Sequence, residues 1–126
     1  MPYIKQEIRS EFALNFDRWA ENPGELNYII TMALGMYGPD DNATIIISEF
    51  ISHYINLKGK SYQTFNDILG VLYAINMEIA RRGFSYKEFV EYIANLSAEF
   101  YETIVAPYED IKIKENGDLE VFKGVK

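Results

Sequence analysis

The chain has 126 residues, of which 48% are hydrophobic and 25% are charged, a composition typical of a globular domain. Its formal net charge of -7 disfavours nucleic-acid and membrane-surface roles, because phosphates and anionic lipids are repelled. There is no cysteine and one histidine, His53, which excludes disulfides, thiol nucleophiles and multi-histidine metal sites. We expect a single domain over residues 1–126, with no cofactor. Because no apolar stretch is typical of a signal peptide or membrane span, we expect it in the cytoplasm.

Hydrophobic periodicity predicts helices along most of the chain. Ile8, Phe12 and Phe16 recur at near-helical spacing and predict a first helix over residues 7–21. The sequence Asn-Pro-Gly-Glu at 22–25 is typical of a helix start, with a cap, an early proline and an acid three residues after the cap. Further apolar faces predict helices from residue 22 to the loop at 38–42, from there to Gly59, from Ser61 to Gly83, and from the capping box of Ser85 and Glu88 to Pro107.

The isoleucine run at 45–47 allows two interpretations. Its β-branched content is typical of a strand. Apolar residues continue at spacings of three and four from Ile47 to Ile55, however, and this favours a helix. The run also places apolar side chains on more than one face of that helix. This surplus predicts that the protein associates with itself.

The C-terminal residues 110–122 alternate between apolar and polar side chains around an Asn-Gly pair at 116–117, which is a strong hairpin signal. A three-residue loop that ends in this glycine would pair Ile113 with Leu119 and keep both faces consistent. The sequence therefore predicts a mostly α fold. We expect a compact bundle of four to five helices with a C-terminal β-hairpin at about 110–122.

Four segments carry a resemblance to a known family. They are the opening MPYIKQE, the segment GELNY at 24–28, the stretch from Ser61 to Leu72, and the block VAPYED at 105–110 with Lys112 and ENGD at 115–118. In these segments the chain resembles a family of small uncharacterised proteins of bacteriophages, prophages and bacteria. The resemblance implies a phage or prophage setting, with the host cytoplasm as location, and supplies no chemistry. The chain differs from the shorter members by an extra helix at about 83–102.

A second similarity is to the MazG-type nucleotide pyrophosphohydrolases. It rests on Phe-Asn-Asp-Ile-Leu at 65–69, Gly-Phe-Ser-Tyr at 83–86 and Ala-Asn-Leu at 94–96. Those enzymes are all-helical and hold magnesium with four acidic side chains on two helices. Asp67 matches the last acid of their second motif, whereas Thr64 stands where that motif has glutamate. The first acidic motif has no convincing match upstream.

Tyr108, Glu109 and Asp110 are candidate ligand-binding residues because they follow Pro107 directly. If the proline ends a helix, the three side chains lie on a rigid corner that can contact a ligand or another subunit. The alternative is that they only terminate the helix and hydrogen-bond to the hairpin.

Two further pairs are candidate ligand-binding residues. Asn27 and Asn66 each lie near the start of an apolar helix and need hydrogen-bond partners there, either a ligand, the backbone or one another. Arg81 and Arg82 form a basic pair at a helix end, which suits a phosphate. The alternative for the arginines is a salt bridge within the protein, for example with Glu78.

Two classes of function remain open. The first is a non-enzymatic, oligomeric binding module for a small nucleotide-like ligand or a host protein, with no catalytic residue and no metal ligand. The alternative is a divergent MazG-like, magnesium-dependent nucleoside triphosphate pyrophosphohydrolase. An acidic cluster across helices would discriminate between them, and it would join Glu25 or Glu49 to Asp67 and Glu78.

Overall fold

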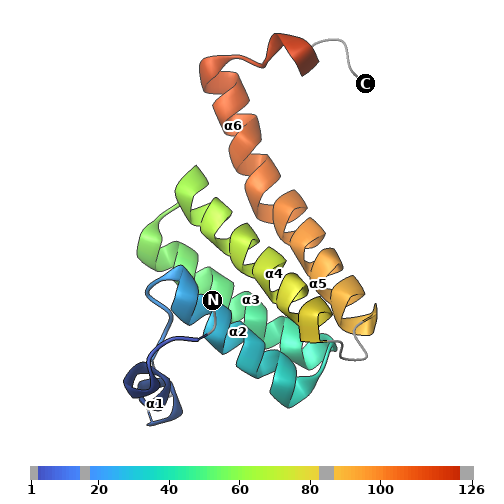
Figure 1. Cartoon of the computed structure of the whole chain (residues 1–126). Helices are drawn as coiled ribbons and strands as arrows, with labels where there is room; N and C mark the ends of the chain where they lie inside the picture. The colour runs from blue at the N-terminus through green and yellow to red at the C-terminus, as the bar shows by residue number, and fades with distance from the viewer. Residues whose placement is uncertain (1–2, 15–17, 83–86, 123–126) are drawn as a thin grey trace.

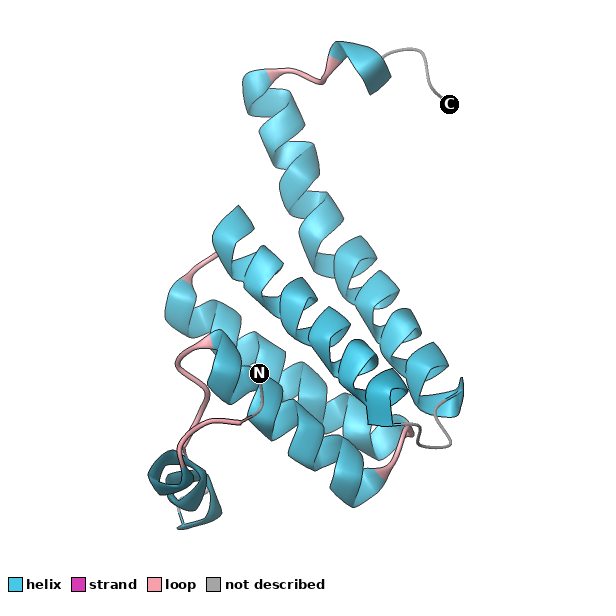
Figure 2. Ribbon diagram, viewed as in Figure 1, coloured by secondary structure: helices cyan, strands magenta, loops and turns pink. Residues whose placement is uncertain are grey.

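A computed structural model describes residues 3–14, 18–82 and 87–122. These residues fold into helices joined by short loops, and Figure 2 shows no strand among them. The mostly α prediction is confirmed. The elements are α1 (Gln6–Leu14), α2 (Pro23–Tyr37), α3 (Asp41–Lys58), α4 (Tyr62–Arg82), α5 (Lys87–Phe100), the π turn η1 (Tyr101–Val105), α6 (Ala106–Asn116) and the 3-10 turn η2 (Glu120–Phe122).

The predicted β-hairpin is wrong. Its first arm lies within α6, and its second arm contains η2. Gly117 ends α6 at φ 84, with its N–H donating to the carbonyl oxygen of Ile113 at 2.8 Å. An Asn-Gly pair suits this role as well as a hairpin turn, because both positions favour a residue with positive φ. The alternation of apolar residues around the pair therefore did not determine the structure.

The helix that was predicted to end at Pro107 continues through it. In η1 the N–H of Ala106 donates to the carbonyl of Tyr101, five residues back, instead of four as in an α-helix. Proline inside an α-helix removes a hydrogen bond and clashes with the carbonyl four residues earlier. Because the π turn resets the register directly before Pro107, the proline occupies the first turn of α6, where its missing N–H is tolerated.

Several predicted helix ends are confirmed. The side chain of Asn22 accepts from the N–H of Glu25 and caps α2, while Gly38 and Gly59 follow the last residues of α2 and α3. The first helix is shorter than predicted, because α1 ends at Leu14 and residues 18–22 are not helical. The predicted capping box at Ser85 and the stop at Gly83 lie outside the described residues.

The core lies where α2 packs on α3 and α4, and α4 packs on α5 (Figure 1). The isoleucine run at 45–47 belongs to α3, as the spacing predicted. Ile47 is fully buried and Ile45 is exposed, so the surplus apolar surface inferred from the run is present. Within the described part of the chain, no helix combines the length and apolarity that crossing a membrane requires.

Helix α6 continues the line of α5 beyond the start of α4 (Figure 1). None of its residues is buried, and its anchor on the bundle is Tyr108, whose ring lies edge-on to Phe65 and Tyr62 with both centroid distances 5.2 Å. The apolar side chains of this C-terminal arm are largely exposed: Ile111, Ile113, Leu119, Val121 and Phe122.

Candidate functional site

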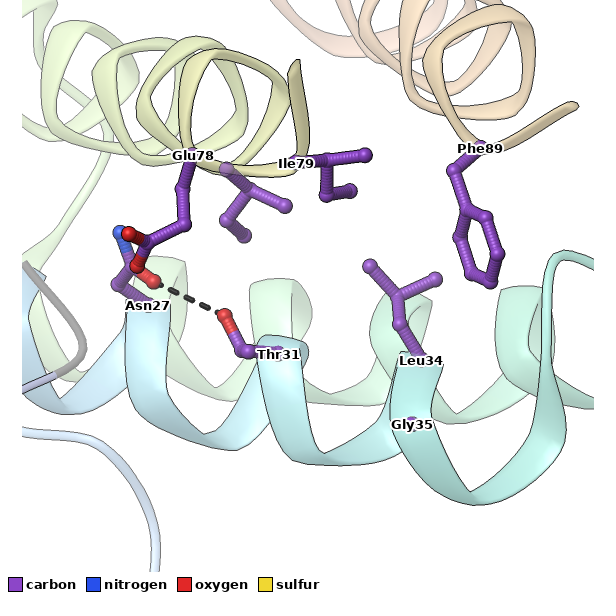
Figure 3. A pocket seen from close by; sticks show the side chains of 8 residues that line it. Asn27, Thr31, Leu34, Gly35, Glu78, Ile79 and Phe89 are labelled. Carbon is purple, nitrogen blue, oxygen red and sulfur yellow. Dashed lines mark hydrogen bonds between the residues drawn. The ribbon is translucent and has the colours of Figure 1, made fainter. Parts of the chain in front are cut away.

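The structure contains an apolar cleft of about 280 Å³ between α2, the end of α4 and the start of α5 (Figure 3). Helix α2 forms one wall, α4 forms the opposite wall, and Phe89 of α5 closes one side. The cleft is lined by Asn27, Thr31, Leu34, Gly35, Ile75, Glu78, Ile79 and Phe89. Its surface is almost entirely apolar.

Helical spacing explains how these walls form. Asn27, Thr31 and Leu34 recur at intervals of four and three residues, so they share one stripe of α2. Gly35 follows them and leaves space, since a Cβ atom at this position would meet nothing within 4 Å. A larger side chain at position 35 would therefore project into space that the cleft now occupies.

The polar end of the cleft brings together Asn27, Thr31 and Glu78. Asn27 is 1% exposed, and its Oδ1 accepts a hydrogen bond from Thr31 Oγ1 at 3.0 Å. This is the one side-chain hydrogen bond that Asn27 makes with the described residues, and it leaves Nδ2 able to donate. Figure 3 shows Glu78 extending from α4 toward Asn27 on α2. A hydrogen-bond donor and a carboxylate therefore lie at the same end of an otherwise apolar hollow.

Glu78 is held by cations on its own helix. Arg81 Nη2 lies 2.9 Å from Glu78 Oε2, and Arg82 Nε lies 3.5 Å from the same oxygen. The hydrogen bond from Arg81 lowers the pKa of Glu78; burial opposes this effect, and Tyr3 and the charge of Arg82 add to it. The carboxylate is therefore ionised at neutral pH. The salt bridge to Glu78 that was the alternative interpretation of Arg81 and Arg82 is present.

The other predicted asparagine does not join this site. Asn66 is exposed, and no hydrogen bond links it to Asn27 within the described structure. Asp67 accepts from Tyr54 Oη at 3.1 Å and from Gln63 Nε2 at 2.8 Å. Burial, together with the charge and hydrogen bond of Asp67, raises the pKa of Tyr54 to about 12. Asp67 therefore holds a buried tyrosine between α3 and α4.

The acids that the pyrophosphohydrolase alternative would bring together have separate surroundings. Glu25 is buried beside Arg18, with Nη1 and Oε1 3.0 Å apart, and it also accepts from the backbone N–H of Glu21. Glu49 is exposed on α3. Asp67 and Glu78 have the partners described above. Across residues 3–14, 18–82 and 87–122, no three His, Cys, Asp or Glu side chains are grouped to hold a metal ion.

Tyr108, Glu109 and Asp110 lie on α6, at the opposite end of α4 from the cleft. Tyr108 packs on the core, Glu109 accepts a hydrogen bond from Tyr101, and Asp110 is exposed. The predicted rigid corner after Pro107 is absent, because the helix continues. Two other hollows flank α6. One of about 340 Å³ is lined in part by Glu109, and one of about 300 Å³ is lined in part by Tyr108.

Sequence reasoning found Asn27 and missed the rest of the cleft. Thr31 lies four residues after Asn27, and two polar residues on one apolar helical face are a signal that the sequence contains. Gly35 extends the same stripe and was also overlooked. Phe89 could not be assigned to the cleft from the sequence, because its position depends on how α5 packs on α4.

Comparison with known proteins gives one family. The model of a domain of unknown function, DUF6899, matches residues 1–88, which is more than half of the 126-residue chain. The chain belongs to this family. No curated protein and no solved structure matches the sequence significantly. The predicted membership of a family of uncharacterised proteins is confirmed at this level.

The DUF6899 match includes both main walls of the cleft. Every cleft residue of α2 and α4 lies within residues 1–88, and Phe89 is the next residue along the chain. The block at 105–118, which contributed to the resemblance in sequence, lies beyond the matched residues. The cleft therefore belongs to the DUF6899 part of the chain, whereas α6 follows it.

Proposed function

We propose that this DUF6899 protein is a non-enzymatic binding module whose cleft between α2, α4 and α5 takes a small, mainly apolar molecule. The observation that carries the proposal is the cleft itself, an apolar hollow of about 280 Å³ with Asn27 and Glu78 at one end. Ligand sites in proteins are concave and mostly apolar, with a few convergent polar groups that fix orientation. The cleft has this character.

The volume of the cleft indicates the size of the ligand. An engineered apolar cavity of about 150 Å³ binds benzene. The cleft measures about 280 Å³, which suits a molecule of one or two rings rather than an extended chain. A whole nucleotide fits less well, because Glu78 offers no donor to its phosphates and the two nearby arginines are already paired with this carboxylate.

Self-association remains part of the proposal. It is supported by apolar side chains that are exposed on several helices, among them Met36 on α2, Ile45 on α3, Tyr73 on α4 and Val121 in the C-terminal arm. We expect light scattering at micromolar concentration to give a mass above that of one chain. A strictly monomeric species would contradict this part. A phage or prophage setting, the cytoplasmic location and a host-protein partner stay predictions from the sequence.

The binding proposal is tested by filling the cleft. Gly35→Leu adds a side chain to the cleft, and Gly70→Leu is its matched control, because Gly70 is also helical with nothing within 4 Å of an added Cβ but does not line the cleft. The probes are indole and indene, with AMP and ATP, with and without magnesium, as alternatives. The readout is the methyl NMR spectrum of Leu34, Ile75 and Ile79.

We expect indole or indene to shift these methyl signals in a saturable way in the wild type and in Gly70→Leu. We expect Gly35→Leu to weaken binding at least about tenfold, because the added side chain occupies the ligand's place. Equal binding by both variants, or no saturable shift with either probe, would overturn the proposal. A magnesium-dependent shift with ATP that moves the methyl signals of Ile68, the neighbour of Asp67, would instead support the pyrophosphohydrolase alternative.

A further inference from the structure

We infer that the cleft recognises a neutral planar ring that carries an N–H donor beside a carbonyl acceptor, the edge that lactams, cyclic ureas and free nucleobases share. The inference rests on the proposed function and specifies the ligand of that site. It follows from what the two polar groups at the end of the cleft can still bind.

Glu78 supplies the acceptor. Its carboxylate is ionised, and an ionised carboxylate only accepts hydrogen bonds, at about four positions. Arg81, Arg82 and Tyr3 are its partners within the described structure. Both arginines contact Oε2, so acceptor capacity remains on this carboxylate, which belongs to a residue that lines the cleft, and a ring N–H can donate to it.

Asn27 supplies the donor. Its Oδ1 is already used by Thr31 at 3.0 Å, so its Nδ2 is the group left to bind a ligand. This amide belongs to a side chain that lines the cleft, and its one hydrogen bond to a described residue is the bond that Oδ1 accepts from Thr31. Because an amide nitrogen only donates hydrogen bonds, a ligand carbonyl at this position is the kind of group that Nδ2 can bind.

The same two groups discriminate against other ligand chemistries. Glu78 offers no hydrogen-bond donor to a phosphate or a carboxylate, because an ionised carboxylate only accepts. An ammonium group gains less from it than from an unpaired acid, because two arginines already balance its charge. The remaining lining is apolar, so a sugar ring would lose its hydration without compensation. A flat apolar ring with one N–H and one adjacent carbonyl satisfies both groups and buries the rest of its surface.

Three bicyclic probes of nearly equal size separate these contributions. Oxindole carries the N–H beside the carbonyl, indole carries the N–H alone, and 1-methyloxindole carries the carbonyl alone. Each is titrated into wild type, with the methyl signals of Leu34, Ile75 and Ile79 as the readout. We expect oxindole to bind at least about fivefold more tightly than either analogue, since a site built to hydrogen-bond a group rejects molecules that lack it.

Asn27→Leu keeps a side chain of similar size and removes the donor. We expect it to bind indole as the wild type does and to lose the preference for oxindole over indole, whereas a merely structural role of Asn27 would change both affinities together. Equal binding of all three probes by the wild type, or a retained oxindole preference in Asn27→Leu, would overturn the lactam inference and leave the proposed function standing. If none of the three probes binds saturably, both the lactam inference and the proposed function are overturned.

Discussion

Arg18 and Glu25 form an ion pair inside the protein at the start of α2, with Arg18 Nη1 3.0 Å from Glu25 Oε1 and the two side chains only 15% and 8% exposed. Burial acts to lower the pKa of Arg18, but the hydrogen bond and the charge of Glu25 outweigh this effect and raise it. Glu25 also accepts from the backbone N–H of Glu21 and from Asn22 Nδ2, so one carboxylate joins the entering chain to the helix start.

We expect Glu25→Ala to lower the free energy of unfolding by about 3 kcal/mol, because removing one member of a buried pair leaves the other charge without compensation. The hydrogen bonds that the carboxylate accepts from the N–H of Glu21 and from Asn22 Nδ2 are lost at the same time. Urea denaturation followed by circular dichroism measures the change. Glu21→Ala is the control, because Glu21 lies 3.6 Å from the same arginine atom but is 67% exposed. We expect the control to change stability by less than about 0.5 kcal/mol, and an equal loss in both variants would contradict a special role of Glu25.

The hydrogen bond between Tyr54 and Asp67 should make the stability of the protein depend on pH in the alkaline range. Tyr54 is buried and donates to Asp67 at 3.1 Å, and its pKa is raised from 10.0 to about 12. The unfolded chain loses this proton at lower pH than the folded chain does. The stability that the protonated tyrosine contributes is therefore complete below pH 10 and is lost as the pH rises toward 12.

We expect Tyr54→Phe to destabilise the protein by about 1–2 kcal/mol at pH 7, because it removes a hydrogen bond to a charged group inside the protein. The stability difference between wild type and variant should then shrink above pH 10, where the wild type loses stability through this group and the variant does not. Urea unfolding at pH 7 and at pH 10.5 checks this prediction. A difference that grows with pH would show that Tyr54 titrates in the opposite sense.

Local signals in the sequence predicted the helical part of the fold well. The sequence at 22–25 places the start of α2 because a side-chain cap and an early proline are determined by neighbouring residues alone. The spacing of apolar residues from Ile47 to Ile55 correctly outweighed the β-branched content of the run before them. These features depend on interactions within a few residues, and the sequence shows both partners.

The C-terminal arm could not be predicted in this way. The alternation at 110–113 fits a strand, but a strand needs a neighbouring strand, and whether one pairs there depends on the whole structure. The π turn before Pro107 shifts the hydrogen-bond register by one residue and lets the helix continue, and no local rule marks this shift. The cleft was missed for a similar reason, since its walls come from α2, α4 and α5 together.

The two mid-helix glycines predict a stability gain. Gly35 and Gly70 lie inside α2 and α4, and a Cβ at either position meets nothing within 4 Å. We expect Gly35→Ala and Gly70→Ala each to stabilise the protein by about 0.5–1 kcal/mol, because alanine loses less backbone entropy in a helix. Gly117→Ala is the contrasting variant, because φ is 84 there, and we expect it to destabilise α6. Thermal unfolding distinguishes the signs, and a loss of stability in Gly70→Ala would contradict the argument.

Tyr108 predicts where the protein opens locally. Helix α6 has no buried residue, and Tyr108 is packed between the rings of Phe65 and Tyr62. The 11 residues of α6 extend the line of α5 beyond the bundle, where a helical segment has little stability in water without packing. We expect Tyr108→Ala to accelerate amide hydrogen exchange in α6 by about tenfold or more, while α2 and α4 keep their protection.

The matched control for this experiment is Tyr73→Ala, because Tyr73 is a tyrosine on the exposed face of α4. We expect it to leave exchange in α6 unchanged, since it removes a ring of the same size without removing the anchor. Uniform acceleration across all helices in Tyr108→Ala would mean that α6 unfolds only with the whole bundle. Unchanged exchange in α6 would mean that the arm is held by contacts other than this ring, and the exposed side chains from Ile111 to Phe122 would be the next to test.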